Sequence, residues 1–455
     1  MIERREPKVG FLVIGHPYFK ILFKMDELRE NTLKDLERLP LDIVAPGYVL
    51  DTSSQVIAAV KMLKEKNVDV AVLFLPEYFQ EELIDIAACE IDFCPIVVWT
   101  LSSSPDTLAP MLGTLVANSH LLHLKKKFFK IIGDGNSRKE DLVKLIKIAK
   151  ASVAVKEIKR AVVAQVGAPN TGMVVTAIDE YSMRRLVPNI LHLDTLELVS
   201  LFNKVSTSEA TKMVGEIRNK VGEVKVSEEE LEKAIRSYLA LKSIIQKYNL
   251  DGIAIREWPE LGAEGMTICL AASLLSEEGV CVTQESDVSS TITSLIQSLC
   301  GGQPNYEVDF GSIDTHTGIS FLFHEGAMPF SFANKKNISL VPAGTSMGLF
   351  QGKQTSGVAV QGAGKEGLIT ASKITANPLY GKMSLLILEG EAISPQQIFP
   401  GLSNFFVKFN CDASEMVDIM TGEGFEHHLV LTYAQIREEL GYFCEMSQIK
   451  RIVPE

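Results

Sequence analysis

The chain has 455 residues, of which 46% are hydrophobic, and a formal net charge of -12 at pH 7. This length exceeds what one hydrophobic core usually supports, so we expect two or three domains and no extensive disorder. The acidic balance argues against a nucleic-acid partner, because such proteins need a basic face to displace the counterions of the phosphates.

Cysteine usage and the N-terminus bear on the compartment. The seven cysteines are scattered and include no CxxC pair, which fits a reduced cytosol better than a disulfide framework or a zinc ribbon. The N-terminus carries neither the apolar segment nor the cleavage site of a signal peptide, and no run of 18 apolar residues occurs. We therefore expect a cytoplasmic protein with no membrane partner.

Short apolar runs alternate with helical patterns from Val9 to about Ser119. The runs lie at residues 9–15, 41–45, 68–75 and 95–99, and helical periods lie between them at 25–38 and 53–65. Continuous Val, Ile and Leu runs with helices between them indicate a parallel sheet that is covered on both faces. We predict a Rossmann-like αβα sandwich domain over residues 1–150.

The same kind of pattern returns over residues 151–300. It begins with an apolar run at 160–167 and continues with two charged helices between Ser206 and Tyr248. Strands are then expected at 252–255 and 280–283, and helices at 264–276 and 288–299. This alternation predicts a second Rossmann-like αβα sandwich domain.

The pattern changes after Cys300-Gly301-Gly302. Residues 301–455 show short strands, closely spaced glycines and few helical periods, and they end in one expected helix and a strand. Such spacing is typical of an antiparallel barrel or sandwich. The expected fold class is therefore α/β, with two sandwich domains followed by a C-terminal antiparallel β-barrel-like domain.

Two nucleotide-binding motifs can be rejected. Gly362-Ala-Gly-Lys365-Glu366 resembles the end of a phosphate-binding loop, but Ala359 and Glu366 stand where that loop needs Gly and Ser or Thr. No GxGxxG follows the first strand of either sandwich, so a nicotinamide or flavin site has little support.

Acidic residues and histidines that follow apolar strands indicate a cation site. Glu285 follows the strand expected at 280–283 and precedes a helix, so it should project at the carboxyl edge of the sheet, where open α/β proteins bind ligands. Asp309 follows a Gly-Gly turn, and His324 closes another apolar run. Carboxylate oxygens and imidazole nitrogens are ligands for a divalent cation such as Mn²⁺.

Each of these residues also has a purely structural interpretation. A Glu at a strand end can support a helix cap, an Asp after a turn can be a turn residue, and a His after a strand can be a satisfied core residue. The adjacent pair His427-His428 beside an apolar run is harder to explain in this way. The order of these residues along the chain, more than any one of them alone, favours a metal enzyme.

Five segments of the C-terminal half are considered together: REWPELG (256–262), GVCVTQESDV (279–288), SLCGGQPNYEVDF (298–310), FLFHEGAMPFSFA (321–333) and GFEHHLVLTY (424–433). In this order they resemble the catalytic half of the L-fucose and L-arabinose isomerase family, whereas the first 250 residues match that family only in layout. The resemblance implies that Glu285, Asp309 and His428 hold one Mn²⁺ or another divalent cation. It also implies that His324 is a ligand or a substrate contact and that His427 contacts the substrate.

The activity that the resemblance implies is a metal-dependent aldose-ketose isomerase, an intramolecular oxidoreductase that acts through a cis-enediol. Glu285 and Asp309 would exchange the protons, while a cation that chelates both sugar oxygens stabilises the developing charge. Two alternatives stay open: a non-catalytic sugar-binding protein on the same architecture, and a metal-dependent sugar epimerase or lyase.

Enzymes of that family build each pocket partly from a neighbouring subunit, so the resemblance also implies a homo-oligomer, a trimer or a hexamer. His16 ends the first strand at the edge that faces a ligand, and His16 or Trp99 would then serve the adjacent chain. Trp258, in the REWPELG segment, is expected to contact the small-molecule sugar.

Overall fold

The computed structural model describes residues 5–103, 107–134, 138–257, 260–263, 266–343, 357–377, 382–394 and 397–455. The chain folds into two compact units, Arg4–Lys156 and Glu157–Glu455. Each unit has its own hydrophobic core. None of the helices in the described residues has both the length and the apolar character needed to cross a bilayer.

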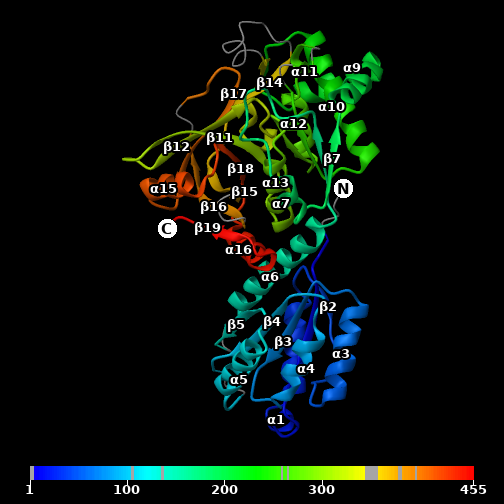
Figure 1. The fold of residues 1–455 in the computed structure, drawn as a ribbon, viewed down its shortest axis with the longest axis vertical. Helices are drawn as coiled ribbons and strands as arrows, with labels where there is room; N and C mark the ends of the chain where they lie inside the picture. Colours follow the sequence, from blue (N-terminus) through cyan, green and yellow to red (C-terminus); the bar gives the residue numbers. More distant parts are fainter. Residues whose placement is uncertain are drawn as a thin grey trace. The chain divides into compact units, whose positions relative to one another are not determined.

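The first unit, blue and cyan in Figure 1, is built on a five-stranded parallel sheet of order β2-β1-β3-β4-β5. Its strands are β1 (Lys8–Val13), β2 (Asp42–Val44), β3 (Val70–Leu75), β4 (Ile96–Leu101) and β5 (Phe128–Gly133). Its helices are α1 (Pro17–Leu22), α2 (Met25–Leu36), α3 (Ser53–Glu65), α4 (Glu82–Glu90), α5 (Pro110–His123) and α6 (Arg138–Ile158), whose last two residues belong to the second unit. Every residue of β3 and β4 is buried, which explains their unbroken apolar sequence.

A buried carboxylate closes the amino-terminal side of this sheet. Asp69, directly before β3, is 2% exposed. Its oxygens accept hydrogen bonds from the Arg5 guanidinium (2.8 Å), the Lys8 backbone N–H (2.9 Å) and the Lys156 ammonium (3.0 Å). Two cations and one amide therefore compensate the desolvation of this single charge.

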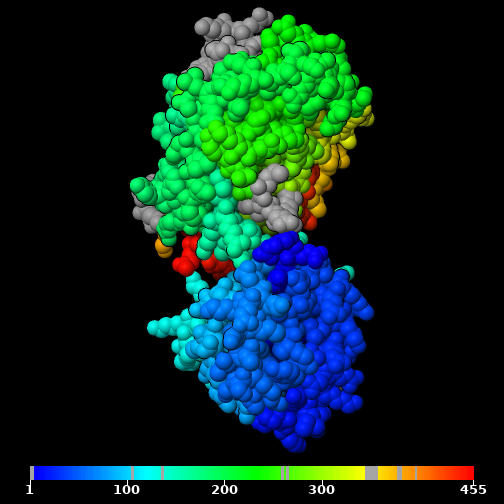
Figure 2. Space-filling model, turned by 90° about the vertical axis from the view of Figure 1, so that its right-hand side faces the viewer, coloured from blue at the N-terminus to red at the C-terminus, as the bar shows by residue number. Residues whose placement is uncertain are grey.

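The second unit begins with a four-stranded parallel sheet of order β10-β9-β6-β7. Its strands are β6 (Val162–Val166), β7 (Asn189–Leu193), β9 (Gly252–Ile255) and β10 (Cys281–Thr283). Its helices are α7 (Glu180–Arg184), α8 (Thr195–Lys204), α9 (Thr207–Arg218), α10 (Glu228–Tyr248), α11 (Glu260–Ala263), α12 (Cys269–Glu277) and α13 (Val288–Cys300). On the face of this unit seen in Figure 2, green segments cover most of the surface, and yellow to orange segments emerge along the right-hand margin.

The C-terminal part of this unit contains a closed six-stranded antiparallel barrel. The ring runs β16-β15-β18-β11-β12-β17 and is closed by pairing between β16 and β17. Its strands are β11 (Tyr306–Asp314), β12 (Ile319–Glu325), β15 (Gly367–Asn377), β16 (Lys382–Ile393), β17 (Leu402–Phe409) and β18 (His428–Thr432). Flanking elements are β8 (Glu223–Val224), β13 (Ser339–Pro342), β14 (Val358–Ala363), β19 (Lys450–Ile452), α15 (Ala413–Glu423), α16 (Arg437–Ser447) and two short 3₁₀ helices, η1 (Phe330–Phe332) and η2 (Lys335–Asn337).

Helix α13 joins the parallel sheet to the barrel. It packs against β9 and β10 of the sheet and against β15 and β18 of the barrel. The Gln297 side-chain amide donates to Ser372 Oγ (2.8 Å) and to the Val430 backbone oxygen (2.7 Å), so the buried polar groups of this helix are used to hold barrel strands. The parallel sheet, helices α10 and α12 and the barrel share one apolar core.

These observations confirm a mixed α/β fold with parallel sheets and a C-terminal antiparallel barrel. Helices α3 and α13 and strand β9 begin at the predicted residues. The helix expected from residue 264 begins at Cys269 in the described residues, and the pattern did not predict β5 or β7, whose residues are partly exposed. The domain boundaries near residues 150 and 300 stay predictions.

Candidate metal centre

Glu285 lies in a tight turn between β10 and α13. Glu285 and Ser286 both adopt left-handed backbone conformations, with φ of +55° and +60°, which are uncommon for residues other than glycine. The turn is held by the Glu285 N–H, which donates to Glu257 Oε2 (2.8 Å), and by the Ser286 N–H, which donates to the Ile255 oxygen (3.0 Å). Such conformations persist only where the surroundings enforce them, and they cluster at functional sites.

His428, the first residue of β18, brings the barrel to this turn. Its ring is fully buried, and Nδ1 lies 2.9 Å from Asp287 Oδ2. The Lys373 ammonium and the His428 ring outweigh the effect of burial and hold the pKa of Asp287 well below its usual range. An ionised carboxylate can only accept, so Nδ1 carries the proton and Nε2 faces Glu285 Oε2 (3.1 Å) and Asp309 Oδ1 (3.4 Å).

The other expected barrel residues lie around the same imidazole. Asp309 on β11 pairs directly with His428 in the strand register. The ring centroids of His324 and His427 are 5.6 Å and 4.2 Å from that of His428. His427 is the most exposed of the five, with 42% of its side chain accessible, and its Nε2 is 3.5 Å from Asp309. The structure thus brings together Glu285, Asp309, His324, His427 and His428.

Several buried polar atoms at this place have no hydrogen-bond partner in the described residues. They are Glu285 Oε2, His428 Nε2 and both ring nitrogens of His324. Ligand atoms of Glu285, His324 and His428 lie within 4.8 Å of one another. Buried polar groups are nearly always paired, and unpaired ones indicate an ion or water that belongs there. This donor set of one carboxylate and two imidazoles fits a divalent cation.

The electrostatics of the cluster agree with this fit. Burial lowers the pKa of His324, which keeps this ring neutral and its lone pair available. Burial raises the pKa of Glu285, but the surrounding imidazoles outweigh burial and lower it, so the carboxylate is ionised. Burial alone would lower the pKa of His428, but the charges of Glu307 and its other acidic neighbours raise it well above the usual range. A cation bound at Nε2 would displace that proton.

Sequence reasoning missed a second layer of charged residues. Glu257 and Glu307 are buried, and their carboxylates accept from the N–H groups of Glu285 and Gln284. Burial raises the pKa of Glu307 to about 8. Lys373, on β15, is 1% exposed and donates to Asp287 (2.6 Å). One signal was available: Glu307 is two residues before Asp309 in the same strand, and so shares its face.

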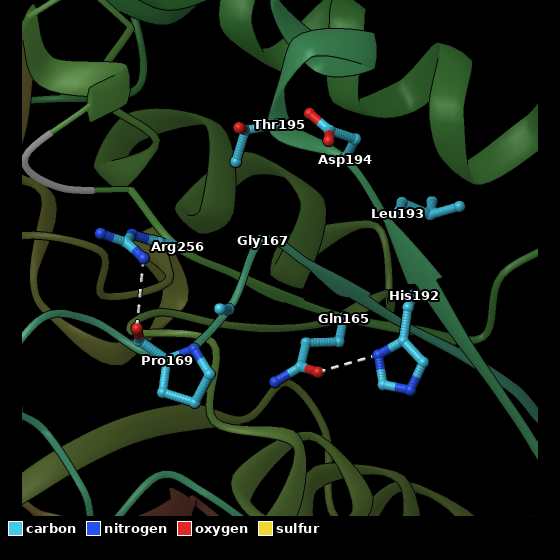
Figure 3. A pocket seen from close by; sticks show the side chains of 9 residues that line it. Gln165, Gly167, Pro169, His192, Leu193, Asp194, Thr195 and Arg256 are labelled. Carbon is cyan, nitrogen blue, oxygen red and sulfur yellow. Dashed lines mark hydrogen bonds between the residues drawn. The ribbon is translucent and has the colours of Figure 1, made fainter.

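A cavity of about 580 Å³ opens at the carboxyl ends of β6, β7 and β9. Figure 3 shows its polar side chains, among them Arg256, which donates to the Pro169 oxygen (3.3 Å), and His192, which faces Gln165 (3.0 Å). The cavity borders the Glu285 turn, because Ser286 Oγ donates to the Gly167 oxygen (2.9 Å) and Gly167 lines the cavity. Gly167 has φ of +78°, and a Cβ there would meet Arg256 Cβ at 3.0 Å.

The remaining predicted residues are elsewhere. His16 belongs to the first unit, where its Nδ1 accepts from the Tyr18 N–H (3.2 Å) and caps α1. Trp99 is fully buried in β4 and donates to Asp141 (3.1 Å), so the expectation that it serves a neighbouring chain is wrong for this conformation. Trp258 lies outside the described residues.

Comparison with known proteins gives similarity along nearly the whole chain. Sulfoquinovose isomerase from Priestia aryabhattai is 24% identical over 445 residues, which cover 95% of this chain and 96% of that protein. Sulfoquinovose isomerase from Alkalicoccus urumqiensis is 27% identical over 203 residues, 44% of each chain. No family model matches the sequence. A solved structure of a periplasmic sugar-binding protein of an ABC transporter from Legionella pneumophila aligns with 65% of this chain and 94% of its own, at 10% identity. The TM-score of 0.14 is too low for this likeness to support an argument.

Proposed function

We propose that this chain is an isomerase that interconverts an aldose and a ketose at a divalent cation held by Glu285, His428, Asp309 and His324. The observation that carries the proposal is the convergence of buried ligand atoms from the β10-α13 turn and the barrel that make no hydrogen bond within the described residues. The similarity to sulfoquinovose isomerases over 95% of the chain supports the reaction type. The resemblance of the C-terminal segments to fucose and arabinose isomerases supports Mn²⁺ as the cation.

The reaction moves one proton between C1 and C2 of the sugar and another between O1 and O2, by way of a cis-enediol. A divalent cation held by these residues would stabilise the negative charge that develops on the sugar, an effect worth several kcal/mol. Glu285 and Asp309 then hold and transfer the protons as base and acid. The Asp287 carboxylate keeps the His428 proton on Nδ1, so that Nε2 faces the reacting centre.

The cavity next to the Glu285 turn would receive the far end of the sugar. Arg256 lines it, and a guanidinium binds sulfonate, phosphate or carboxylate oxygens in a fork. The N-terminus of α8, at Thr195, adds a positive partial charge, although the Asp194 carboxylate that caps this helix opposes it. We therefore propose a sugar with an anionic group at its far end, such as sulfoquinovose, as the substrate.

The test uses the whole protein after removal of metal with a chelator. Mn²⁺ is added back, and sulfoquinovose, 6-deoxyhexoses and pentoses are each incubated in D₂O while deuterium incorporation at C2 and product formation are followed by NMR. We expect exchange together with ketose formation, dependent on Mn²⁺. Exchange with inverted configuration at C2 would instead show an epimerase, cleavage products a lyase, and binding without exchange a sugar-binding protein.

Two variants sharpen this test. Glu285→Gln should abolish turnover, and full turnover in this variant would remove the mechanism. Arg256→Gln should raise KM for an anionic sugar by about tenfold to a hundredfold, as expected for a lost charged hydrogen bond, while a neutral sugar is unaffected. Arg236→Gln, which removes a guanidinium packed on Phe202 away from the cavity, is the matched control.

We also propose a homo-oligomer, a trimer or a hexamer, in which His16 of one chain serves the pocket of another. This assembly rests on the family resemblance. We propose a cytoplasmic location because the seven cysteines are scattered and include no CxxC pair. Light scattering of the purified protein tests the assembly, and a monomeric, fully active enzyme would contradict it. If His16 serves a neighbouring pocket, His16→Ala should raise KM for the sugar. An unchanged KM in this variant would contradict that role.

A further inference from the structure

A second set of ligand atoms lies on the opposite side of the His428 ring from Glu285. Ligand atoms of Asp287, Glu426 and His428 lie within 4.8 Å of one another, so this set is also compact enough to hold an ion. Glu307 Oε1 is 3.6 Å from His428 Nδ1, so a third carboxyl group lies beside this set. Of these, Asp287 and Glu307 are almost fully buried.

This second set already has an occupant. The Lys373 ammonium donates to Asp287 Oδ2 (2.6 Å) and Ser290 Oγ (2.7 Å) and forms an ion pair with Glu426 Oε1. The Lys373 side chain is 1% exposed and belongs to barrel strand β15. An ammonium has three N–H donors, and these three contacts use all of them.

We propose that Lys373 acts as a built-in cation that fills this second ligand set, so that the chain binds one divalent ion and not a pair. Carboxylates packed this closely require a positive charge between them. His428 lies between the two sets, with Nε2 toward the first set and the Nδ1–H toward Asp287 of the second. An ion in the second set would therefore lie on the far side of the ring from the proposed cation and would be held mainly by the carboxylates of Asp287 and Glu426.

Lys373 thereby also positions a ligand of the first site. Asp287 Oδ1 accepts from the Ser290 N–H (2.9 Å) at the start of α13, while Oδ2 contacts both Lys373 and His428. The carboxylate is held from two sides, so the ring it contacts has one orientation. Lys373 touches no proposed ligand atom of the first site, and its role is that of a positioning residue.

The experiment counts bound metal and does not depend on turnover. Wild type, Lys373→Met and the matched control Lys408→Met, which removes an exposed lysine of β17, are stripped with chelator, saturated with Mn²⁺ and freed of excess ion. Mn²⁺ per chain is measured by mass spectrometry, and spin coupling by electron paramagnetic resonance. We expect one ion in wild type and Lys408→Met, but two in Lys373→Met, with the signal of a coupled pair.

The inference rests on the proposed divalent site, but the two can fail separately. Wild type without bound Mn²⁺ would contradict the proposed function. Lys373→Met with no more Mn²⁺ than wild type, or wild type with two ions, would overturn the role of Lys373. Lys373→Gln, which keeps a hydrogen-bond donor toward Asp287, provides a second neutral variant if the Met variant does not fold, and it should also bind a second ion.

Discussion

Two buried carboxylates, Asp69 in the first unit and Glu285 in the second, have opposite surroundings. Asp69 is surrounded by donors on all sides, from Arg5, Lys8 and Lys156. Burial raises the pKa of Asp69, but these partners outweigh burial and lower it. Glu285 Oε2 makes no hydrogen bond in the described residues, and its only contact of this kind is the 3.1 Å ion pair with His428 Nε2. Its backbone conformation is one that few residues adopt unaided.

The contrast separates a structural charge from a functional one. The cations that compensate Asp69 are side chains of the same unit, so removing the carboxylate should harm the fold. The groups around Glu285 leave ligand atoms unpaired, which costs stability and is expected where a ligand completes the site. Both side chains are buried carboxylates, and both have a lowered pKa. They differ in how completely their oxygens are hydrogen-bonded.

The largest effect is expected at the shared imidazole. His428→Ala removes the nitrogen that faces both Glu285 and Asp309, and we expect kcat/KM for the sugar to fall by about 10³-fold or more, corresponding to the several kcal/mol that a bound cation supplies. Mn²⁺ affinity, measured by titration calorimetry, should fall as well. His316→Ala, an exposed histidine of the β11-β12 turn, is the control, and equal losses in both variants would contradict the assignment.

Removing the satisfied charge should destabilise the first unit. Asp69→Asn leaves Arg5 and Lys156 without their shared partner, and we expect a loss of about 3 kcal/mol in the free energy of unfolding, at the low end for a broken buried pair because both cations reach water. Urea denaturation followed by Trp99 fluorescence in a Trp258→Phe background measures it. Asp92→Asn, in the exposed pair with Lys64, should cost less than about 1 kcal/mol.

Removing an unsatisfied group should have the opposite sign. His324→Phe keeps a ring next to Tyr306 but removes two unpaired nitrogens, and we expect the metal-free protein to gain about 1 kcal/mol of stability. Thermal melting of chelator-treated protein measures the gain. His324→Gln, which leaves a polar group in place, should show none. A destabilised Phe variant would mean that this ring is structurally satisfied after all.

The smallest effect at neutral pH concerns the titration of Asp69. Its pKa in the folded state is below the ordinary 3.8, so its contribution to stability is fully present above that value and is lost as pH falls through the lowered pKa. The stability difference between wild type and Asp69→Asn should therefore be constant from pH 7 to about pH 5 and shrink at more acidic pH. A difference that grows on acidification would reverse the sign of the shift.

Much of the fold and part of the site could be predicted because they depend on local patterns. Glu285 follows an apolar strand and precedes a helix, and that placement alone predicts a carboxylate at the carboxyl edge of the sheet. Lys373 could not be found this way, since Ser372 and Ile374 beside it are buried too and no alternation marks its face. The prediction for Trp99 was wrong for a related reason. Every residue of β4 is buried, so its sequence has no alternation to show which side chains face a cleft.

The direct pairing of Asp309 with His428 in a closed ring of strands has a consequence for how such a chain can diverge. Inserting one residue within β11 would set Leu429 or His427 opposite Asp309 and turn the following side chains to the other face. Because the ring has no free edge, neighbouring strands would have to shift as well. Substitutions of single ligand residues can therefore occur without disturbing the barrel. Insertions and deletions are confined to connections such as residues 315–318.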